Sequence, residues 1–461
     1  MKKLILIYLS LAIAGCKSTQ KMESSAKVAH LITLDPGHFH AALVQKSMYA
    51  DVDPVVHVYA PPGPDLALHL NRIKAYNSQA VNPTRWKEEV YEGNDFLQKM
   101  LDEKKGNVVV MAGNNRKKTE YILKAVQAGF NVLADKPMAI DKQNFELLRE
   151  AFETADNKNV LLYDIMTERF EITTILQRML AQMPELFGHL QQGTTDQPAV
   201  TKESVHYFFK YVSGAALTRP PWFMDVTQEG EGIVDVTTHL VDLVQWECFP
   251  EQALDYRKDI RVTAAKRWPT EMTRSQFNNL TGLNGFPHYL KKDMVSDTVL
   301  QVYSNGEINY EIKGVHAKVS VIWKYKAPEG AGDTHYSIMR GTRTNLVIRQ
   351  GAEQGYKPAL YIEPVVTSDA AYEKSLSNAL ATIQAKYQGV ELRKTAAGWE
   401  VMIPEKYREG HESHFARVTE NFLKYFKEGK LPAWEVPNMI AKYYTTTTAL
   451  ELANKTTSST Q

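Results

Sequence analysis

The sequence predicts an α/β protein in which a doubly wound parallel sheet is followed by an α+β domain with an open, largely antiparallel sheet. From residue 30 to residue 135, short apolar runs alternate with helical patterns. That order is typical of parallel strands covered by helices. From residue 288 to residue 350, β-branched and aromatic residues alternate with polar ones, which predicts strands with one covered face.

The N-terminal elements follow from apolar runs bounded by turn residues. Buried strands are predicted at 30–34, 55–59, 107–112 and 131–134. Helices are predicted at 38–48, 96–104 and 118–127. Near the C-terminus, 411–427 and 438–453 have helical patterns and are expected to return over the body of the protein.

The first sixteen residues have the order of an export signal. A basic start, Met1 to Lys3, precedes a short apolar run, and Ala14 and Gly15 stand directly before Cys16. The run is shorter than the about 20 residues of a membrane-spanning helix. We therefore expect Cys16 to be lipidated and to anchor the protein in the cell envelope, facing the periplasm. An ordinary cleaved signal with an incidental cysteine is the alternative.

Charge and cysteine content limit the classes of binding partner and the disulfides that the sequence predicts. Lys and Arg number 54 against 53 Asp and Glu, and no basic stripe indicates nucleic acid. No second apolar segment predicts a membrane span. The chain has two cysteines, so with Cys16 lipidated only Cys248 remains. No intrachain disulfide is expected, and Cys248 is interpreted as a small buried residue.

The turn after the first predicted strand is the first candidate site. It has the register of a G-x-G-x-x-G turn, in which backbone amides approach a pyrophosphate at a helix N-terminus, but only the central glycine is present. The six residues are Asp35, Pro36, Gly37, His38, Phe39 and His40. The acidic residue expected after the second strand is missing. On these residues alone, a plain strand-to-helix turn is an equal alternative.

The second candidate is Asp135-Lys136-Pro137, at the end of the predicted strand 131–134. Ligands of a doubly wound sheet bind at the carboxyl ends of its strands, so Lys136 is expected to face the crevice. Pro137 restricts the backbone there. A lysine can stabilise the alkoxide that forms when a hydroxyl is oxidised. The alternative is a solvated loop lysine.

The third candidate is a glycine-led segment with Asp235, His239 and Asp242. If the segment is helical, the three side chains share one face. A histidine flanked by carboxylates is a competent general base. A helix-end charge beside a structural histidine is the alternative. A metal site at these three residues is also open, but no second cluster of ligands accompanies them, so no metal is predicted.

In this order the three segments resemble the Gfo/Idh/MocA family of oxidoreductases. Asp135-Lys136-Pro137 is similar to the family's E-K-P motif, with aspartate for glutamate. Residues 235–242 are similar to D-x-G-x-H-x-x-D, with threonine for the inner glycine. Residues 111–115 stand where the family has an A-T-P-N loop. The resemblance spans residues 31–325, and the remainder looks like an extension found in an exported subfamily.

The resemblance implies an N-terminal Rossmann domain and hydride transfer between a nicotinamide and a secondary hydroxyl of a sugar, glycoside or polyol. His239 would take the hydroxyl proton, Lys136 would assist, and Asp235 would position His239 or the substrate. The cofactor would be NAD, with NADP the alternative. Its expected contacts are the turn at 35–40 together with Gly113, Asn114, Asn115, Asp135, Lys136 and Pro137. The expected substrate contacts are Tyr163, Trp222 and Asp242.

The domain boundaries expected from this comparison are a signal at 1–16, a linker at 17–28, a Rossmann domain at 29–160, a substrate and oligomerisation domain at 161–400 and a helical extension at 401–461. No free nicotinamide pool is expected outside the inner membrane, so the cofactor is expected to be tightly held. Two other functions remain open: an NAD-dependent glycosidase acting by oxidation and elimination, and a non-catalytic sugar-binding lipoprotein. The expected partners are a small sugar or glycoside and the membrane, and a homo-oligomer is compatible with the resemblance.

Overall fold

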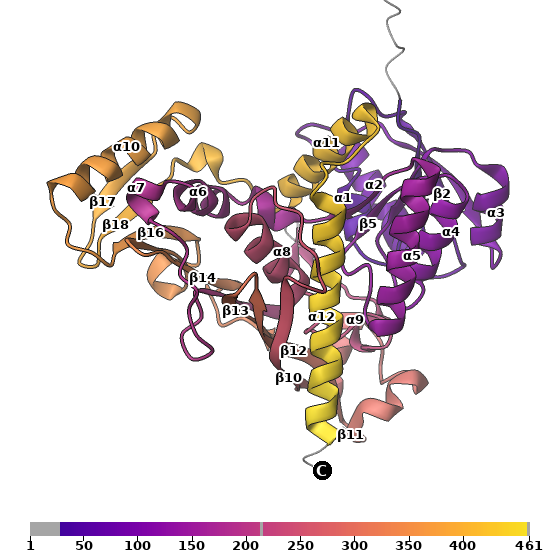
Figure 1. Ribbon diagram of the computed structural model, residues 1–461. Coiled ribbons are helices and arrows are strands. Elements are labelled where there is room, and N and C mark those ends of the chain that lie inside the picture. Colours follow the sequence, from indigo (N-terminus) through magenta and orange to yellow (C-terminus); the bar gives the residue numbers. More distant parts are fainter. Residues whose placement is uncertain (1–27, 213–214, 459–461) are drawn as a thin grey trace, which may run out of the picture.

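The computed structural model describes residues 28–212 and 215–458 (Figure 1). The expected signal, Cys16 and nearly all of the linker lie outside these residues. Within the described part of the chain, no helix has both the length and the apolar character needed to cross a bilayer.

The N-terminal sheet has six parallel strands in the order β3-β2-β1-β4-β5-β6. The strands are β1 Leu31–Leu34, β2 Val55–Ala60, β3 Lys87–Glu92, β4 Val108–Met111, β5 Asn131–Asp135 and β6 Leu162–Ile165. Strands β1, β4, β5 and β6 are buried along their whole length, as strands covered on both faces must be. This strand order is that of a Rossmann sheet, which confirms the predicted fold class.

Helices cover both faces of this sheet (Figure 1). They are α2 Pro64–Ser78, α3 Phe96–Glu103, α4 Lys118–Gln127 and α5 Lys142–Lys158. The predicted helix at 38–48 is wrong in extent, because α1 spans only His40–Leu43. Side chains take the carbonyls that a longer helix would use: the Trp86 indole donates to the Gln45 carbonyl, and the Tyr49 hydroxyl donates to the Val44 carbonyl.

The second sheet has ten strands, with order β10-β12-β13-β7-β14-β15-β16-β18-β17 and β11 beside β12. Only the β13–β7 pair is parallel, so the predicted largely antiparallel sheet is confirmed. Its strands are β7 Val200–Phe209, β10 Ile260–Thr273, β11 Met294–Ser296, β12 Val299–Ile312, β13 Val315–Lys326, β14 Thr334–Arg340, β15 Thr344–Gln350, β16 Ala359–Pro364, β17 Glu391–Lys394 and β18 Trp399–Met402. A separate pair is formed by β8 Tyr211–Val212 and β9 Ala215–Ala216.

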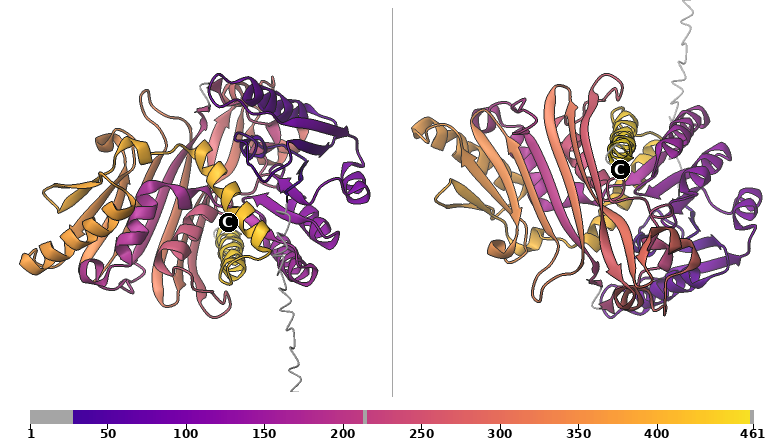
Figure 2. Two further views of the ribbon diagram at one scale, coloured as in Figure 1. Left: turned by 90° about the horizontal axis from the view of Figure 1, so that it is seen from above. Right: turned by 90° about the horizontal axis from the view of Figure 1, so that it is seen from below.

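Helices cover one face of the second sheet and leave strands of the other open to view (Figure 2). The covering helices are α6 Ile172–Ala181, α7 Pro184–Phe187, α8 Thr237–Cys248 and α10 Ala370–Lys386, while α9 Arg274–Thr281 lies at the β10 end. A large apolar core fills the space between these helices and the sheet. Cys248 is half-buried against that core.

The two C-terminal helices join the two halves of the protein. In α11 His411–Glu428, apolar side chains such as Phe415 and Phe422 enter the core of the Rossmann domain. Helix α12 Glu435–Ser458 contacts α5, α8 and β10 and runs between the two sheets (Figure 1). The prediction that these segments return over the body is confirmed.

Candidate active site between the two sheets

A cavity of about 1460 Å³ lies between the carboxyl ends of the Rossmann strands and the second sheet. Its polar lining comes from segments far apart in the chain. Among the lining residues are His38, His40, Lys136, Glu168, Ser204, His206, Lys210, Arg219, Glu229, Asp235, His239, Asp333, His335, His411 and His414. The cavity combines acidic, basic and imidazole side chains with a few aromatic ones, a lining that suits a small polar ligand.

Lys136 and Asp235 form a nearly buried ion pair on the Rossmann side of the cavity. Lys136 directly follows β5, and its Nζ donates a hydrogen bond to Asp235 Oδ1. Burial alone would lower the pKa of Lys136, but the neighbouring carboxylates of Asp235 and Asp135 outweigh it and raise the pKa. Lys136 is therefore a permanent cation at neutral pH, suited to stabilising a developing alkoxide.

His239 lies in the first turn of α8 and lines the same cavity. Its Nδ1 is buried and has no hydrogen-bond partner among the described residues. Burial, followed by the positive charge of Lys136, lowers the pKa of His239 to about 3. The imidazole is therefore neutral at physiological pH, which is the form that can accept a proton.

The predicted common helix face of Asp235, His239 and Asp242 is wrong, because α8 begins only at Thr237. The chain before it runs close to β12: a Cβ on Gly232 would lie 1.7 Å from the Ser304 carbonyl oxygen. Asp235 lies ahead of the helix. Asp235 and His239 nevertheless both line the cavity.

Asp242 lies outside the cavity lining, in a buried ion network. It accepts hydrogen bonds from Arg169 Nε at 2.6 Å and from Lys442 Nζ at 2.8 Å. Arg169 also binds Glu435, and Lys442 binds Asp164 at 2.7 Å. The positive charges of Arg169 and Lys442 overcome burial and lower the pKa of Asp242. The network joins β6, α8 and α12, so its role is structural.

Tyr163 and Trp222, the other expected substrate contacts, also lie outside the cavity lining. The Tyr163 hydroxyl donates to Glu435 at 3.2 Å and so belongs to the same network. Trp222 covers the turn after β1. Its neighbour Phe223 does line the cavity.

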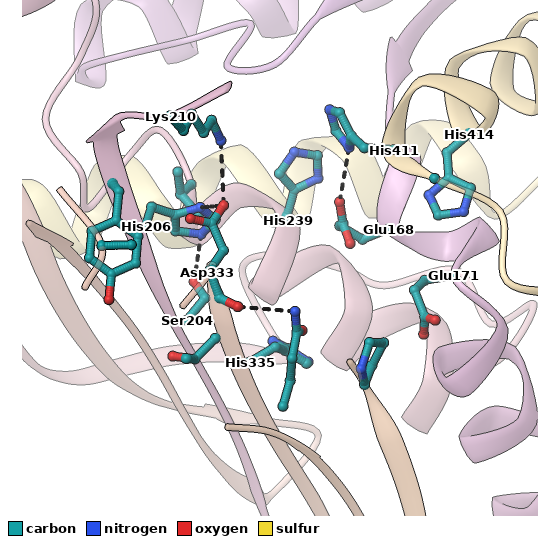
Figure 3. Close-up of a pocket in the computed structure, with 18 of the residues that line it drawn as sticks. Glu168, Glu171, Ser204, His206, Lys210, His239, Asp333, His335, His411 and His414 are labelled. Atoms are coloured by element: carbon teal, nitrogen blue, oxygen red, sulfur yellow. Dashed lines mark hydrogen bonds and ion pairs between the residues drawn. The ribbon is translucent and has the colours of Figure 1, made fainter. Parts of the chain in front are cut away.

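Sequence reasoning missed the wall formed by the second sheet and α11 (Figure 3). His206 Nδ1 lies 3.3 Å from Asp333, and Lys210 lies 3.4 Å from the same carboxylate. His411 lies 3.6 Å from Glu168. In Figure 3, His239 stands between these two groups. Only the spacing of residues 204 and 206, which share one face of a strand, was a signal available in the sequence.

The turn at residues 35–40 is closed. The amide of Gly37 donates to the Asp35 carbonyl at 2.9 Å, and the amide of His38 donates to the Ala112 carbonyl at 3.1 Å. Asp35 has a positive φ of 47°, the conformation for which a dinucleotide turn uses glycine. Gly113 fits tightly against this turn, since its Cβ would lie 2.1 Å from the Asp35 carbonyl oxygen.

Trp222 lies over the turn and fixes it further. A Cβ on Gly37 would meet the Trp222 ring at 2.9 Å, and the indole nitrogen donates to Asp65 at 2.7 Å. Asp65 is in the first turn of α2, close to Asp35. Burial and then the Asp65 charge raise the pKa of Asp35 to about 6. The amides of Gly37 and His38, which a pyrophosphate would need, are thus engaged, and the carboxylates of Asp35 and Asp65 stand beside them.

The remaining expected cofactor residues connect this edge of the sheet to the second domain. Asn114 donates to the Gln228 side chain at 2.7 Å, and Asn115 donates to the Glu229 carbonyl at 2.6 Å. Asp135 is buried beside His38 and His40. The carbonyls of Asp135 and Pro137 accept hydrogen bonds from Lys118.

The protein combines a Rossmann domain and an α+β domain around one cavity. The family model described as "Oxidoreductase family, NAD-binding Rossmann fold" matches residues 61–164, and the model described as "Putative oxidoreductase C terminal domain" matches residues 176–454. The chain belongs to the Gfo/Idh/MocA oxidoreductases that carry this C-terminal domain. No curated protein was found that matches it.

Solved structures agree with this assignment. A crystal structure described as "a putative oxidoreductase", from Parabacteroides merdae, is 58% identical, with a TM-score of 0.91 over 94% of this chain and 98% of that one. An oxidoreductase structure from Thermotoga maritima, also titled "putative", is 13% identical, with a TM-score of 0.58 over 93% of this chain and 98% of that one. Levoglucosan dehydrogenase in complex with NADH and levoglucosan is 12% identical, with a TM-score of 0.57 over 92% and 97%. The last two are similar in fold alone.

Family membership supports a nicotinamide cofactor. The turn in this structure does not fit the pyrophosphate of such a cofactor, because its amides are engaged and Trp222, Asp35 and Asp65 surround the position. A dinucleotide could reach these amides only after Trp222 left Gly37.

Proposed function

We propose that this protein is an oxidoreductase acting on a secondary hydroxyl of a sugar, glycoside or polyol, with NAD as the default cofactor and NADP the alternative. The observation that carries the proposal is the cationic Lys136, paired with Asp235, in the same cavity as the neutral imidazole of His239. A cation and a neutral base facing one space can remove a hydroxyl proton and stabilise the oxyanion that remains.

The roles of the three side chains follow from their charges. His239 accepts the hydroxyl proton, because its low pKa keeps the imidazole free of a proton before substrate binds. Lys136 donates a hydrogen bond to the developing alkoxide and keeps its charge, because the neighbouring carboxylates raise its pKa. Asp235 positions Lys136 through their ion pair. The turn after β1 takes no part in this proton transfer.

The lining of the cavity supports a polyhydroxylated substrate. Asp333, Glu168 and Arg219 offer acceptors and donors in fixed positions. Trp323 and Phe223 add aromatic surface at the same cavity. Sugars are bound through such combinations of polar and aromatic contacts, with few polar groups fixing the orientation.

The closed turn favours a second candidate, a sugar-binding protein that has kept the scaffold and lost the cofactor. A panel of methyl glycosides and polyols distinguishes the two candidates by whether the protein oxidises these compounds or only binds them. With NAD or NADP present, the oxidoreductase yields reduced nicotinamide, measured by its absorbance. Binding by calorimetry without reduction or product would refute the first candidate and support the second. Glycoside cleavage without net reduction would replace both with the glycosidase.

We also propose, on the sequence alone, that Cys16 is lipidated and holds the protein in the cell envelope, facing the periplasm. The native protein should incorporate radiolabelled fatty acid and Cys16→Ser should not. Equal labelling of both would refute this proposal.

A further inference from the structure

Two histidines and an aspartate converge at the mouth of the closed turn. His40 Nδ1 lies 2.9 Å from Asp135 Oδ2, and His38 Nδ1 lies 3.7 Å from the same oxygen. The two imidazole rings are 4.1 Å apart and perpendicular. One ligand atom from each of the three residues lies within 4.8 Å of the others. His38 and His40 line the cavity.

We propose that His38, His40 and Asp135 bind a divalent transition metal ion of the Zn²⁺ class. Two imidazoles and one carboxylate are a ligand set that such ions use when positions are left open for a small molecule. The site is separate from the proposed proton-transfer residues, and its existence does not depend on the proposed substrate.

The separations suit this ligand set. Ligand atoms about 2.1 Å from a Zn²⁺ ion lie about 3.0–3.4 Å from one another in octahedral or tetrahedral geometry. The His40–Asp135 and His38–Asp135 separations of 2.9 and 3.7 Å already bracket this range. All three ligand atoms lie within 4.8 Å of one another, so side-chain rotations that draw His38 and His40 together would let the cluster surround an ion.

An unused oxygen gives independent support. Asp135 is only 3% exposed. Its Oδ1 is buried and has no hydrogen-bond partner among the described residues. An unpaired buried carboxylate oxygen is costly unless a ligand or ion satisfies it. A metal ion bound to His38 and His40 would lie next to this carboxylate.

The two nearest lysines do not take the place of an ion. Lys118 Nζ donates to the backbone carbonyls of Asp135 and Pro137, at 3.1 and 3.4 Å. Lys136 Nζ is bonded to Asp235. Neither of these described amino groups donates a hydrogen bond to the Asp135 carboxylate, so that carboxylate remains available to His38, His40 and an ion.

The site explains why histidines stand at 38 and 40. A dinucleotide turn uses small residues at such positions so that backbone and helix can approach the cofactor. Here the imidazoles turn towards β5 and the cavity instead. Open coordination positions would face the cavity and accept a hydroxyl or carboxylate oxygen of a bound ligand.

The proposal is tested by titrating the chelator-treated full-length protein with Co²⁺, followed by its visible absorption, and with Zn²⁺ by calorimetry. The wild type should bind one ion per chain. His40→Asn and Asp135→Asn should each weaken binding by at least the about 10–100-fold that altered metal surroundings cost. His206→Asn is the matched control, because His206 lines the same cavity but pairs with Ser204 and Asp333.

If His40→Asn does not fold, the isosteric Asp135→Asn and the partly exposed His38→Asn provide the same comparison, with folding checked by circular dichroism. Absence of Co²⁺ and Zn²⁺ binding by the wild type at micromolar concentrations would overturn the proposal. Binding that is unchanged in all three cluster variants, or lost equally in His206→Asn, would overturn it as well. These readouts do not involve turnover, so they are independent of the proposed oxidoreductase function.

Discussion

Two loops leave the same edge of the Rossmann sheet and differ in what they offer a ligand. The turn after β1 directs the amides of Gly37 and His38 to the carbonyls of Asp35 and Ala112, and it lies under Trp222. The loop after β5 presents Lys136 to a large cavity that it shares with His239. Topology places both loops where ligands of this fold bind. The difference between them shows that a position at the ligand-binding edge of the fold is not sufficient for a binding site. Local hydrogen bonds determine whether a loop is accessible to a ligand.

The largest effect on turnover is expected in the cavity that the loop after β5 shares with His239. His239→Asn should lower turnover by ~10²–10⁴-fold, because the neutral imidazole that accepts the proton is lost, while ligand binding measured by calorimetry should persist. Initial rates with a responsive glycoside or polyol measure this.

The matched control for this experiment is His206→Asn, on the opposite wall of the cavity. A loss of turnover in His206→Asn as large as in His239→Asn, or turnover by His239→Asn equal to that of the wild type, would show that the chemistry does not depend specifically on His239.

The segment after β6, which carries Arg169, leaves the same edge of the Rossmann sheet and stabilises the fold. Arg169→Met would leave the carboxylates of Asp242 and Glu435 buried without this partner. The free energy of unfolding, measured in urea, should fall by about 3–5 kcal/mol. Arg261→Met removes an exposed pair with Glu311 and should cost no more than about 1 kcal/mol. Equal costs for both variants would contradict the structural role of the network.

A smaller effect is expected from pH. Burial lowers the pKa of His69 and of His239 to about 3, and that of His335 to about 4. Unfolding returns them to their ordinary range near 6.5, so the unfolded chain binds more protons and stability falls as pH decreases through that value. Between pH 7.5 and pH 5.5 each group should cost about 1 kcal/mol.

Urea unfolding of the wild type and of His69→Gln at the two pH values measures this contribution. The wild type should lose more stability than His69→Gln, because the variant lacks one of the suppressed protonations. Identical losses would argue against a buried neutral His69. The acidic limb of the turnover profile should likewise lie well below pH 6, since the neutral form of His239 is the active one.

The sequence predicted the fold class and the residues of the β5 loop because both are local signals. Apolar runs mark β1, β4 and β5, whereas β3 was missed because Lys87–Glu92 is a largely exposed edge strand with little apolar content. Spacing alone placed Asp235 on the helix. It could not show that α8 begins only at Thr237.

The sequence could not predict which distant segments meet at the cavity. His206, Asp333 and His411 come from two strand regions and a helix that meet only in the folded chain. Asp242 has the spacing of a site residue, yet its partners Arg169 and Lys442 are 73 and 200 residues away. The closure of the turn by Trp222 depends on a contact with Asp65, 157 residues away.

The central claim is that Trp222 must leave Gly37 before a dinucleotide can bind at the turn after β1, while the cavity beyond β5 is open without such a change. The most direct measurement is calorimetric titration with NAD of the wild type and of Trp222→Ala, with Asp65→Asn as a variant that keeps the ring, together with the nicotinamide content of the denatured protein. We predict no stoichiometric nicotinamide in the wild type and NAD binding tighter in Trp222→Ala by about tenfold or more, equivalent to about 1.4 kcal/mol. Stoichiometric nicotinamide in the wild type, with affinity lost in Trp222→Ala, would contradict the claim.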